Sequence, residues 1–160
     1  MRALAAAAAG ATVAVGVLVA TTAVAAPGPS PAPPPPAPTP GPVVTGTLDG
    51  GTRARQDGIA LRTRDDATVR TFTLTYPALA ESGWHQHPGV VLATVESGAV
   101  VQRVGCRSNV WTAGQSFTEV EPHLIINRSP TEPAVLRITQ IVPAGATLRE
   151  NVDPPRCRRS

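Results

Sequence analysis

The chain has 160 residues and a formal net charge of +3 at pH 7. Its fourteen basic residues are dispersed among eleven acidic ones and form no basic run, so we expect no nucleic-acid partner. Nucleophile triads, phosphate-binding loops and paired carboxylates at catalytic spacing are not apparent in the sequence.

The N-terminal stretch has the pattern of a targeting segment. Residues 3–25 form an uncharged, largely apolar run that follows Arg2 and ends in small residues. This pattern predicts a secretory signal peptide over residues 1–25, and therefore an exported protein. The run is also long enough to span a bilayer, so the alternative is an uncleaved anchor that holds the rest of the chain outside the membrane.

A proline-rich stretch follows, with ten of the chain's eighteen prolines in residues 27–42. Proline removes backbone donors and fixes φ, so we expect a disordered or polyproline II linker over residues 26–42. Such a spacer suits attachment near a membrane or wall, and it equally suits a released protein with a disordered leader. Residues 43–160 have the length of one ordinary domain.

Within this domain the dominant period is two. Residues 71–76 alternate polar and apolar side chains, are rich in β-branched and aromatic types, and stop at Pro77. Similar runs cover 90–95, 99–104, 123–127 and 134–142, and Ser97-Gly98 looks like the turn of a hairpin. No amphipathic helix is evident beyond the N-terminal segment. Many short strands at this spacing predict an all-β, antiparallel sandwich or barrel.

The histidines are the best clue to function. The chain has three, and His85 and His87 are separated by one residue. Residues i and i+2 of a strand leave the same face, so both imidazoles could reach one ion. His123 would supply a third ligand, and three histidines are a known set for a zinc site that keeps one position free. The pattern predicts a site for one divalent metal ion.

The two cysteines, Cys106 and Cys157, read as one disulfide in an exported protein. This bond would tie the C-terminal tail back to a loop inside the domain. The alternative is that both are metal ligands beside the histidines, but no Cys-x-x-Cys spacing supports it.

The spacing of these residues resembles the cupin family. Its first motif is similar to Gly-x5-His-x-His-x3-4-Glu-x6-Gly, and here His85, His87 and Gly98 lie at the matching distances. Its later motif ends in His-x3-Asn, which His123 and Asn127 match. The resemblance covers about residues 71–145. It implies a small antiparallel jelly-roll β-barrel with a metal held inside it.

The chain departs from the cupin pattern at two positions of the first motif. Val91 stands where the family has its glutamate, and Leu79 stands where it has its opening glycine, with Gly83 nearer the histidines. The later motif also lacks its Pro-x-Gly. Because Val91 cannot donate an oxygen, the resemblance implies a metal held by three neutral imidazoles, strongly Lewis-acidic and unlike the two-histidine, one-carboxylate iron sites.

Two carboxylates are possible substitutes for the missing ligand. Glu119 and Glu121 share the strand parity of His123. However, Pro122 interrupts the regularity of that strand, so we expect exposed carboxylates at the rim. Asn127 is expected to satisfy a turn or a hydrogen bond behind the site.

Two functions fit these residues. The first is a metal-dependent enzyme that acts on a small molecule; the alternative is a non-catalytic module that binds a metal or small ligand outside the cell. No residue stands out as a general base, so the sequence does not determine whether the protein is an enzyme. It also leaves the identity of the metal open among zinc, iron, manganese, copper and nickel.

Overall fold

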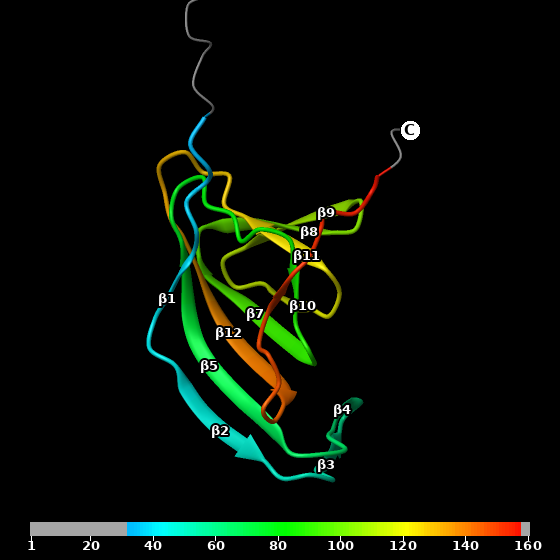
Figure 1. Ribbon diagram of the computed structural model, residues 1–160. Coiled ribbons are helices and arrows are strands. Elements are labelled where there is room, and N and C mark those ends of the chain that lie inside the picture. The colour runs from blue at the N-terminus through cyan, green and yellow to red at the C-terminus, as the bar shows by residue number, and fades with distance from the viewer. Residues whose placement is uncertain (1–31, 158–160) are drawn as a thin grey trace, which may run out of the picture. The chain divides into compact units, whose positions relative to one another are not determined.

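Thirteen strands and no helix make up residues 32–157, the part of the chain that the computed structural model describes (Figure 1). No segment of that part is a helix with the length and apolar character needed to cross a membrane. The predicted signal peptide over residues 1–25, and its alternative as an anchor, lie outside the described residues and stay predictions.

Eight strands form two antiparallel sheets. The first sheet has the order β5 (Ala67–Tyr76), β12 (Ala134–Pro143), β7 (Val90–Ser97) and β10 (Ser116–Glu119). The second has the order β6 (His85–Gln86), β11 (His123–Ile126), β8 (Ala99–Val104) and β9 (Arg107–Thr112). Between β5 and β12, every connection joins a strand of one sheet to a strand of the other, apart from the β8–β9 hairpin, which stays within the second sheet. This is the arrangement of a double-sheet jelly roll, and it confirms the predicted fold class.

The core lies between these two sheets, because alternate residues of each strand point inward. On β5 and β12 the even-numbered side chains face the core. Each fully buried aliphatic or aromatic side chain contributes about 1.5–3 kcal/mol. The largest members of the core come from both sheets: Phe72, Tyr76, Val91, Val95, Val100, Phe117, Ile125, Leu136 and Ile138.

Four of the five predicted strand segments lie within observed strands, and the fifth, 123–127, extends one residue past the end of β11 at Ile126. The predicted hairpin turn is also present, since β7 ends at Ser97, β8 begins at Ala99 and Gly98 has a φ of 71°. A Cβ at Gly98 would lie 2.8 Å from the carbonyl oxygen of Pro133, so both backbone conformation and space require glycine here. The pattern missed β9, whose side chains are mostly exposed, and β10, which has four residues with alternating exposed and buried side chains.

Five further strands complete the structure. β2 (Val44–Leu48) pairs with β5 at the edge of the first sheet, and β13 (Glu150–Asn151) pairs with β6 at the edge of the second. β3 (Arg53–Gln56) and β4 (Ile59–Arg62) form a separate two-stranded hairpin. The last, β1 (Thr39–Pro40), lies in the proline-rich stretch and pairs with β5.

The proline-rich stretch therefore departs from the expected linker over residues 36–41. Thr39 and Pro40 lie opposite Thr75 and Leu74 of β5, and the Gly41 N–H donates to the Thr73 carbonyl at 2.9 Å. The Pro36 carbonyl accepts a hydrogen bond from Glu81 N–H at 3.1 Å. A proline can occupy an edge strand because its missing N–H can face away from the ladder. The barrel therefore begins before residue 43, and the linker over residues 26–35 stays a prediction.

Cys106 and Cys157 are joined in a disulfide, with their Cα atoms 5.6 Å apart. The bond ties the tail after β13 to the β8–β9 turn, as predicted. Their sulfur atoms are consequently unavailable as thiolate ligands, which removes the alternative that they bind a metal.

Candidate metal centre

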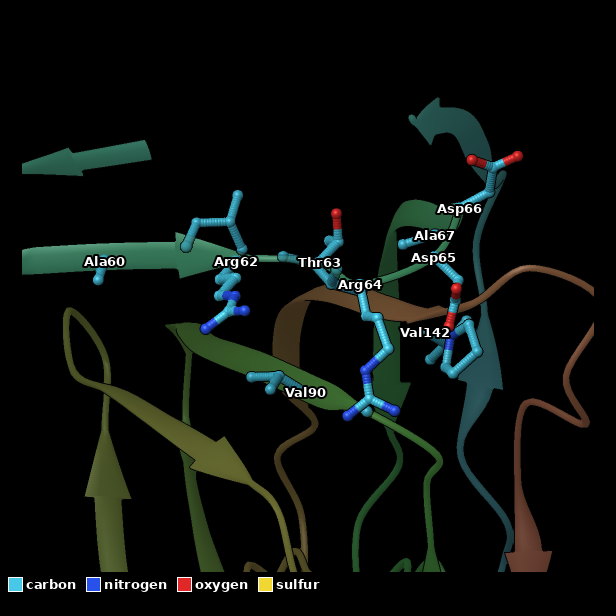
Figure 2. A pocket seen from close by; sticks show the side chains of 13 residues that line it. Ala60, Arg62, Thr63, Arg64, Asp65, Asp66, Ala67, Val90 and Val142 are labelled. Atoms are coloured by element: carbon cyan, nitrogen blue, oxygen red, sulfur yellow. The ribbon is translucent and has the colours of Figure 1, made fainter. Parts of the chain in front are cut away.

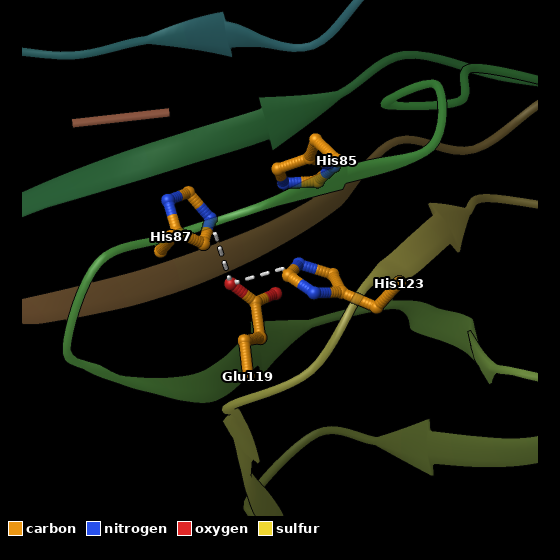
Figure 3. A group of neighbouring side chains, drawn as sticks. All are labelled: His85, His87, Glu119 and His123. Atoms are coloured by element: carbon orange, nitrogen blue, oxygen red, sulfur yellow. Dashed lines mark ion pairs between the residues drawn. The ribbon is translucent and has the colours of Figure 1, made fainter. Parts of the chain in front are cut away.

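The three histidines converge although they are far apart in the sequence. His85 on β6 lies directly opposite His123 on β11, and their ring centroids are 4.2 Å apart. His87 follows β6 and returns to the same face, with its ring centroid 4.9 Å from that of His85. The His87 and His123 ring centroids are 5.5 Å apart. Figure 3 shows the three imidazoles around one point.

Glu119 completes this group, which corrects the expectation that it is an exposed rim carboxylate. It is buried at the end of β10, and one ligand atom from each of His85, His87, Glu119 and His123 lies within 4.8 Å of the others. Its side chain points inward because it shares the face of the buried Phe117, two residues earlier in β10, and the strand ends at Glu119, before Pro122. Glu121 does remain exposed, and only its backbone carbonyl takes part.

The position of Glu119 explains how the chain manages without a glutamate at Val91. Glu119 is the direct cross-strand partner of Val91 in the β7–β10 pair. Directly opposite residues of an antiparallel pair point to the same face of the sheet. The carboxylate thus enters the barrel on β10, from the strand adjacent to Val91.

Each histidine is oriented by a backbone carbonyl. The Nδ1 atoms of His85, His87 and His123 lie 2.9, 2.7 and 2.6 Å from the carbonyl oxygens of Gly83, Leu148 and Glu121. A carbonyl oxygen only accepts, so each Nδ1 must carry the hydrogen. In a neutral imidazole that choice leaves the Nε2 lone pair free, which is the arrangement typical of metal-ligating histidines.

In these neutral imidazoles the Nε2 atoms carry no hydrogen, so they cannot donate a hydrogen bond to the Glu119 carboxylate that they face. His87 Nε2 and His123 Nε2 lie 3.6 and 3.4 Å from Glu119 Oε2, and the fully buried His123 Nε2 has no hydrogen-bond partner. Figure 3 marks both contacts. Lone pairs gathered around one point are stabilised by a positive charge between them, which a metal ion or a proton on His123 can supply. Ligands about 2.1 Å from one tetrahedral ion are about 3.4 Å from each other, so these separations fit a metal.

The surroundings shift the histidine pKa values in different directions. Burial lowers the pKa of His85 to about 4 and also lowers that of His87. Burial alone would lower the pKa of His123 too, but the adjacent Glu119 carboxylate outweighs it and the pKa of His123 is raised. Without a metal, the group therefore favours neutral His85 and His87, with any proton held on His123.

These shifts predict that the metal-free protein loses stability on acidification. Between pH 6.5 and about 4 the unfolded chain binds a proton at His85 that the folded chain does not, so the free energy of unfolding falls as pH falls through this window. His85 alone accounts for about 3 kcal/mol. His87 acts in the same direction, whereas the contribution of His123 is lost as pH rises above 6.5.

The measurement is urea unfolding of chelator-treated protein at intervals from pH 7 to pH 4.5. His85→Gln, which cannot titrate, should show a shallower pH dependence than the parent chain. Equal slopes for the two proteins would contradict the assignment of a buried, neutral His85.

The metal-binding group opens into a cavity of 410 Å³ between the sheets. His85, His87 and Glu119 lie at its wall, and the proline-rich segment around Pro38 and Pro40 lines its rim. Sequence reasoning did not identify the other polar residues of this cavity, because they are scattered along the chain and form no recognisable motif. They are Arg70, Tyr76, Ser82, Gln140 and Arg149.

A second cavity, of 360 Å³, lies where β4 meets the ends of β7 and β12 (Figure 2). Arg62, Arg64 and Asp65 line it, and it contains no histidine. Among residues 32–157, the group of His85, His87, Glu119 and His123 is the one cluster of three or more potential metal ligands. We therefore place the candidate site in the first cavity.

Asn127 supports the site from behind, as expected. Its buried Nδ2 donates to the carbonyls of Tyr76, Pro77 and Glu132 at 3.1, 2.9 and 2.8 Å, and its Oδ1 accepts from the Ser129 N–H. The side chain thus fixes the chain that leaves β11 to the end of β5, and it does not reach the histidines.

Leu79 is also informative, because it stands where the cupin pattern has a glycine. Its φ is 59°, in the left-handed region that favours glycine. Leu79 therefore holds a backbone conformation that is uncommon for a residue with a branched side chain.

Comparison with known proteins finds no matching family model and no matching curated protein. Partial structural likenesses include a protein with a double-stranded β-helix domain from Klebsiella pneumoniae (20% identical; 53% of this chain and 75% of that chain; TM-score 0.46). A cupin-like protein from Thermotoga maritima is 16% identical (54% and 65%; TM-score 0.45), and a cupin superfamily protein from Desulfitobacterium hafniense is 10% identical (62% and 77%; TM-score 0.43). The fold itself is assigned from the strand order.

Proposed function

We propose that this protein binds one divalent transition metal through His85, His87, His123 and Glu119. The observation that carries the proposal is the meeting of three Nε2 lone pairs and a carboxylate oxygen, with each Nδ1 hydrogen committed to a backbone carbonyl. A structural cluster of histidines would instead pair its ring nitrogens with donors and acceptors of the protein. The buried, unpartnered His123 Nε2 is costly unless a cation occupies the site.

The donor set defines the chemistry that such an ion would supply. Three imidazoles and one carboxylate suit zinc, iron, manganese, copper and nickel, and the Glu119 charge makes the bound ion less electrophilic than three histidines alone would. A bound ion of this kind polarises oxygen-containing ligands. Because the group opens into the cavity, a small molecule can approach it.

A catalytic role is the second candidate, and Tyr76 is the observation that favours it. Tyr76 is buried, lines the same cavity, and burial raises its pKa well above the usual range. Its phenol oxygen therefore keeps its proton and can donate a hydrogen bond to a bound molecule. In an enzyme Tyr76 would hold a proton in the cavity; in a binding module it would orient the ligand.

We propose further that the protein is exported. The Cys106–Cys157 disulfide supports this, since such bonds persist in oxidising compartments. The apolar pattern of residues 1–25 is consistent with a signal peptide.

The test is metal affinity in two matched glutamate variants. Glu119→Gln removes a carboxylate from the group, whereas Glu121→Gln removes an exposed carboxylate two residues away and keeps the carbonyl that holds His123. We expect the parent chain and Glu121→Gln to bind one equivalent of zinc with equal affinity. Glu119→Gln should bind it at least about tenfold more weakly, because three neutral imidazoles remain.

The readout is elemental analysis of purified protein, followed by zinc titration against a competing chelator. A parent chain that holds no stoichiometric metal after loading with zinc, manganese, iron, copper or nickel would overturn the proposal. Equal zinc affinities of the two variants would remove Glu119 from the site.

A further inference from the structure

We infer that the cavity beside the metal-binding group receives a small organic acid, whose carboxylate pairs with Arg70 and whose carbon chain lies along Phe72 and Ile138. The inference rests on the proposed function for the location of the site. It adds the chemical class of the ligand and a residue that selects it.

The strand register places Arg70 in line with the metal-binding carboxylate. Arg70 on β5 lies opposite Gln140 on β12, Gln140 lies opposite Val91 on β7, and Val91 lies opposite Glu119 on β10. Directly opposite residues share a face, so the four side chains form one row across the inner face of the first sheet. Glu119 ends the row at the histidines, and Arg70 ends it on the other side of the cavity.

The guanidinium of Arg70 is positioned by the protein and keeps free donors. Its Nη1 donates to Gln140 Oε1 at 2.9 Å, and its Cζ lies 5.4 Å from the centroid of the Phe72 ring. A guanidinium has five N–H donors, and no carboxylate of residues 32–157 lies within ion-pair distance of this one. An arginine held in this way is preorganised to bind a carboxylate through two parallel hydrogen bonds.

The charges around the cavity favour an anion. Arg70 and Arg149 both line it, and Glu119 is the only carboxylate among its lining residues within the described chain. Arg149 donates to the Ser82 carbonyl and lies close enough to lower the pKa values of His85 and His87. With a divalent ion bound, positive charge exceeds negative charge in this space. An anionic ligand would compensate it.

Much of the remaining cavity wall is apolar. In the next row of the sheet, Phe72 lies opposite Ile138, so both side chains stand beside Arg70 and Gln140. Pro38 from the proline-rich segment and Leu148 also line the cavity. A ligand with a carboxylate at Arg70 therefore meets hydrocarbon along its length, which favours an acid with an aliphatic or aromatic body over a phosphate or a sugar.

The experiment compares hexanoate with hexanamide, which has the same carbon chain but no charge. Each is titrated by NMR into zinc-loaded and chelator-treated forms of the parent chain, Arg70→Gln and Arg137→Gln. Arg137 is the matched control, since it lies on β12 but on the exposed face, where it pairs with Glu96 at 2.7 Å. We expect Arg70→Gln to weaken hexanoate binding about tenfold or more, with hexanamide unaffected and Arg137→Gln like the parent.

Two results would overturn the inference. One is equal affinity of the parent for hexanoate and hexanamide. The other is hexanoate binding that disappears with the metal but is the same in Arg70→Gln and Arg137→Gln, which would place the carboxylate on the ion alone. The zinc content of the loaded protein shows whether the metal site fails. The dependence on Arg70 is measured independently, in the chelator-treated protein.

Discussion

Replacing His123 with alanine is expected to remove the bound metal and leave the barrel folded. His123 is fully buried, its Nε2 lies 3.4 Å from Glu119 Oε2, and its Nδ1 is held by the Glu121 carbonyl. The alanine variant loses one ligand and leaves the Glu119 carboxylate without its nearest imidazole. Zinc affinity should fall at least about a hundredfold, more than the loss caused by changing a residue behind the ligands. Elemental analysis after dialysis should then find no stoichiometric metal.

A control is needed because the truncated side chain leaves a cavity in the core. His87→Ala removes a ligand that already lines the cavity, so its truncation widens existing space, and it should lose the metal equally. Circular dichroism and an intact disulfide show whether each variant is folded. Folded variants of both kinds that retain the parent's metal content would contradict the site.

Removing the disulfide is expected to cause the largest change in stability. Cys106 and Cys157 are 51 residues apart, and the chain-entropy model gives such a cross-link about 4 kcal/mol. The double variant Cys106→Ser/Cys157→Ser should therefore lower the free energy of unfolding by about that amount. Urea unfolding of the oxidised parent and the double variant, both loaded with zinc, measures the difference.

The reduced parent chain provides the matched control for the two serine substitutions. Reduction should lower the free energy of unfolding by the same amount, since it breaks the same cross-link without changing any side-chain size. A difference of less than about 1 kcal/mol between oxidised and reduced protein would show that the cross-link contributes little. Non-reducing peptide mapping identifies the joined pair directly.

The fold was predictable because its strands are marked locally. Residues 71–76 and 134–142 alternate in polarity and became β5 and β12, and Ser97-Gly98 became the hairpin turn between β7 and β8. The His-x-His spacing was equally local, since two residues of one extended segment share a face. The register between strands has no such local marker, and this limited the prediction of the site.

Glu119 illustrates that limit. Along the chain it stands four residues before His123 and three before Pro122, and these neighbours suggested an exposed rim position. In the folded protein its neighbour is Val91, across the β7–β10 pair. The cost of burying a carboxylate is offset there by the histidines, which the sequence places in two separate segments.

The proline-rich segment shows the same dependence on context. Its composition predicted a linker, because proline cannot continue a ladder from both sides. Pro36, Thr39 and Gly41 nevertheless bond to the barrel, where β5 offers an edge with unpaired backbone groups. Composition indicates the conformation of the isolated segment. In the folded protein, pairing with the edge strand β5 makes part of it a β-strand.

The sequence by itself determined the elements and the chemical types: strands of period two, a cysteine pair, and three imidazoles in a metal-binding pattern. The tertiary structure decided which residues share a space. It places Glu119 beside the histidines and Arg70 in the same row as Glu119, across four strands. It also places part of the proline-rich segment in the wall of the cavity. The physical reason is that strand periodicity is set by bonds along the chain, whereas the cross-strand neighbours are set by backbone hydrogen bonds between segments distant in sequence.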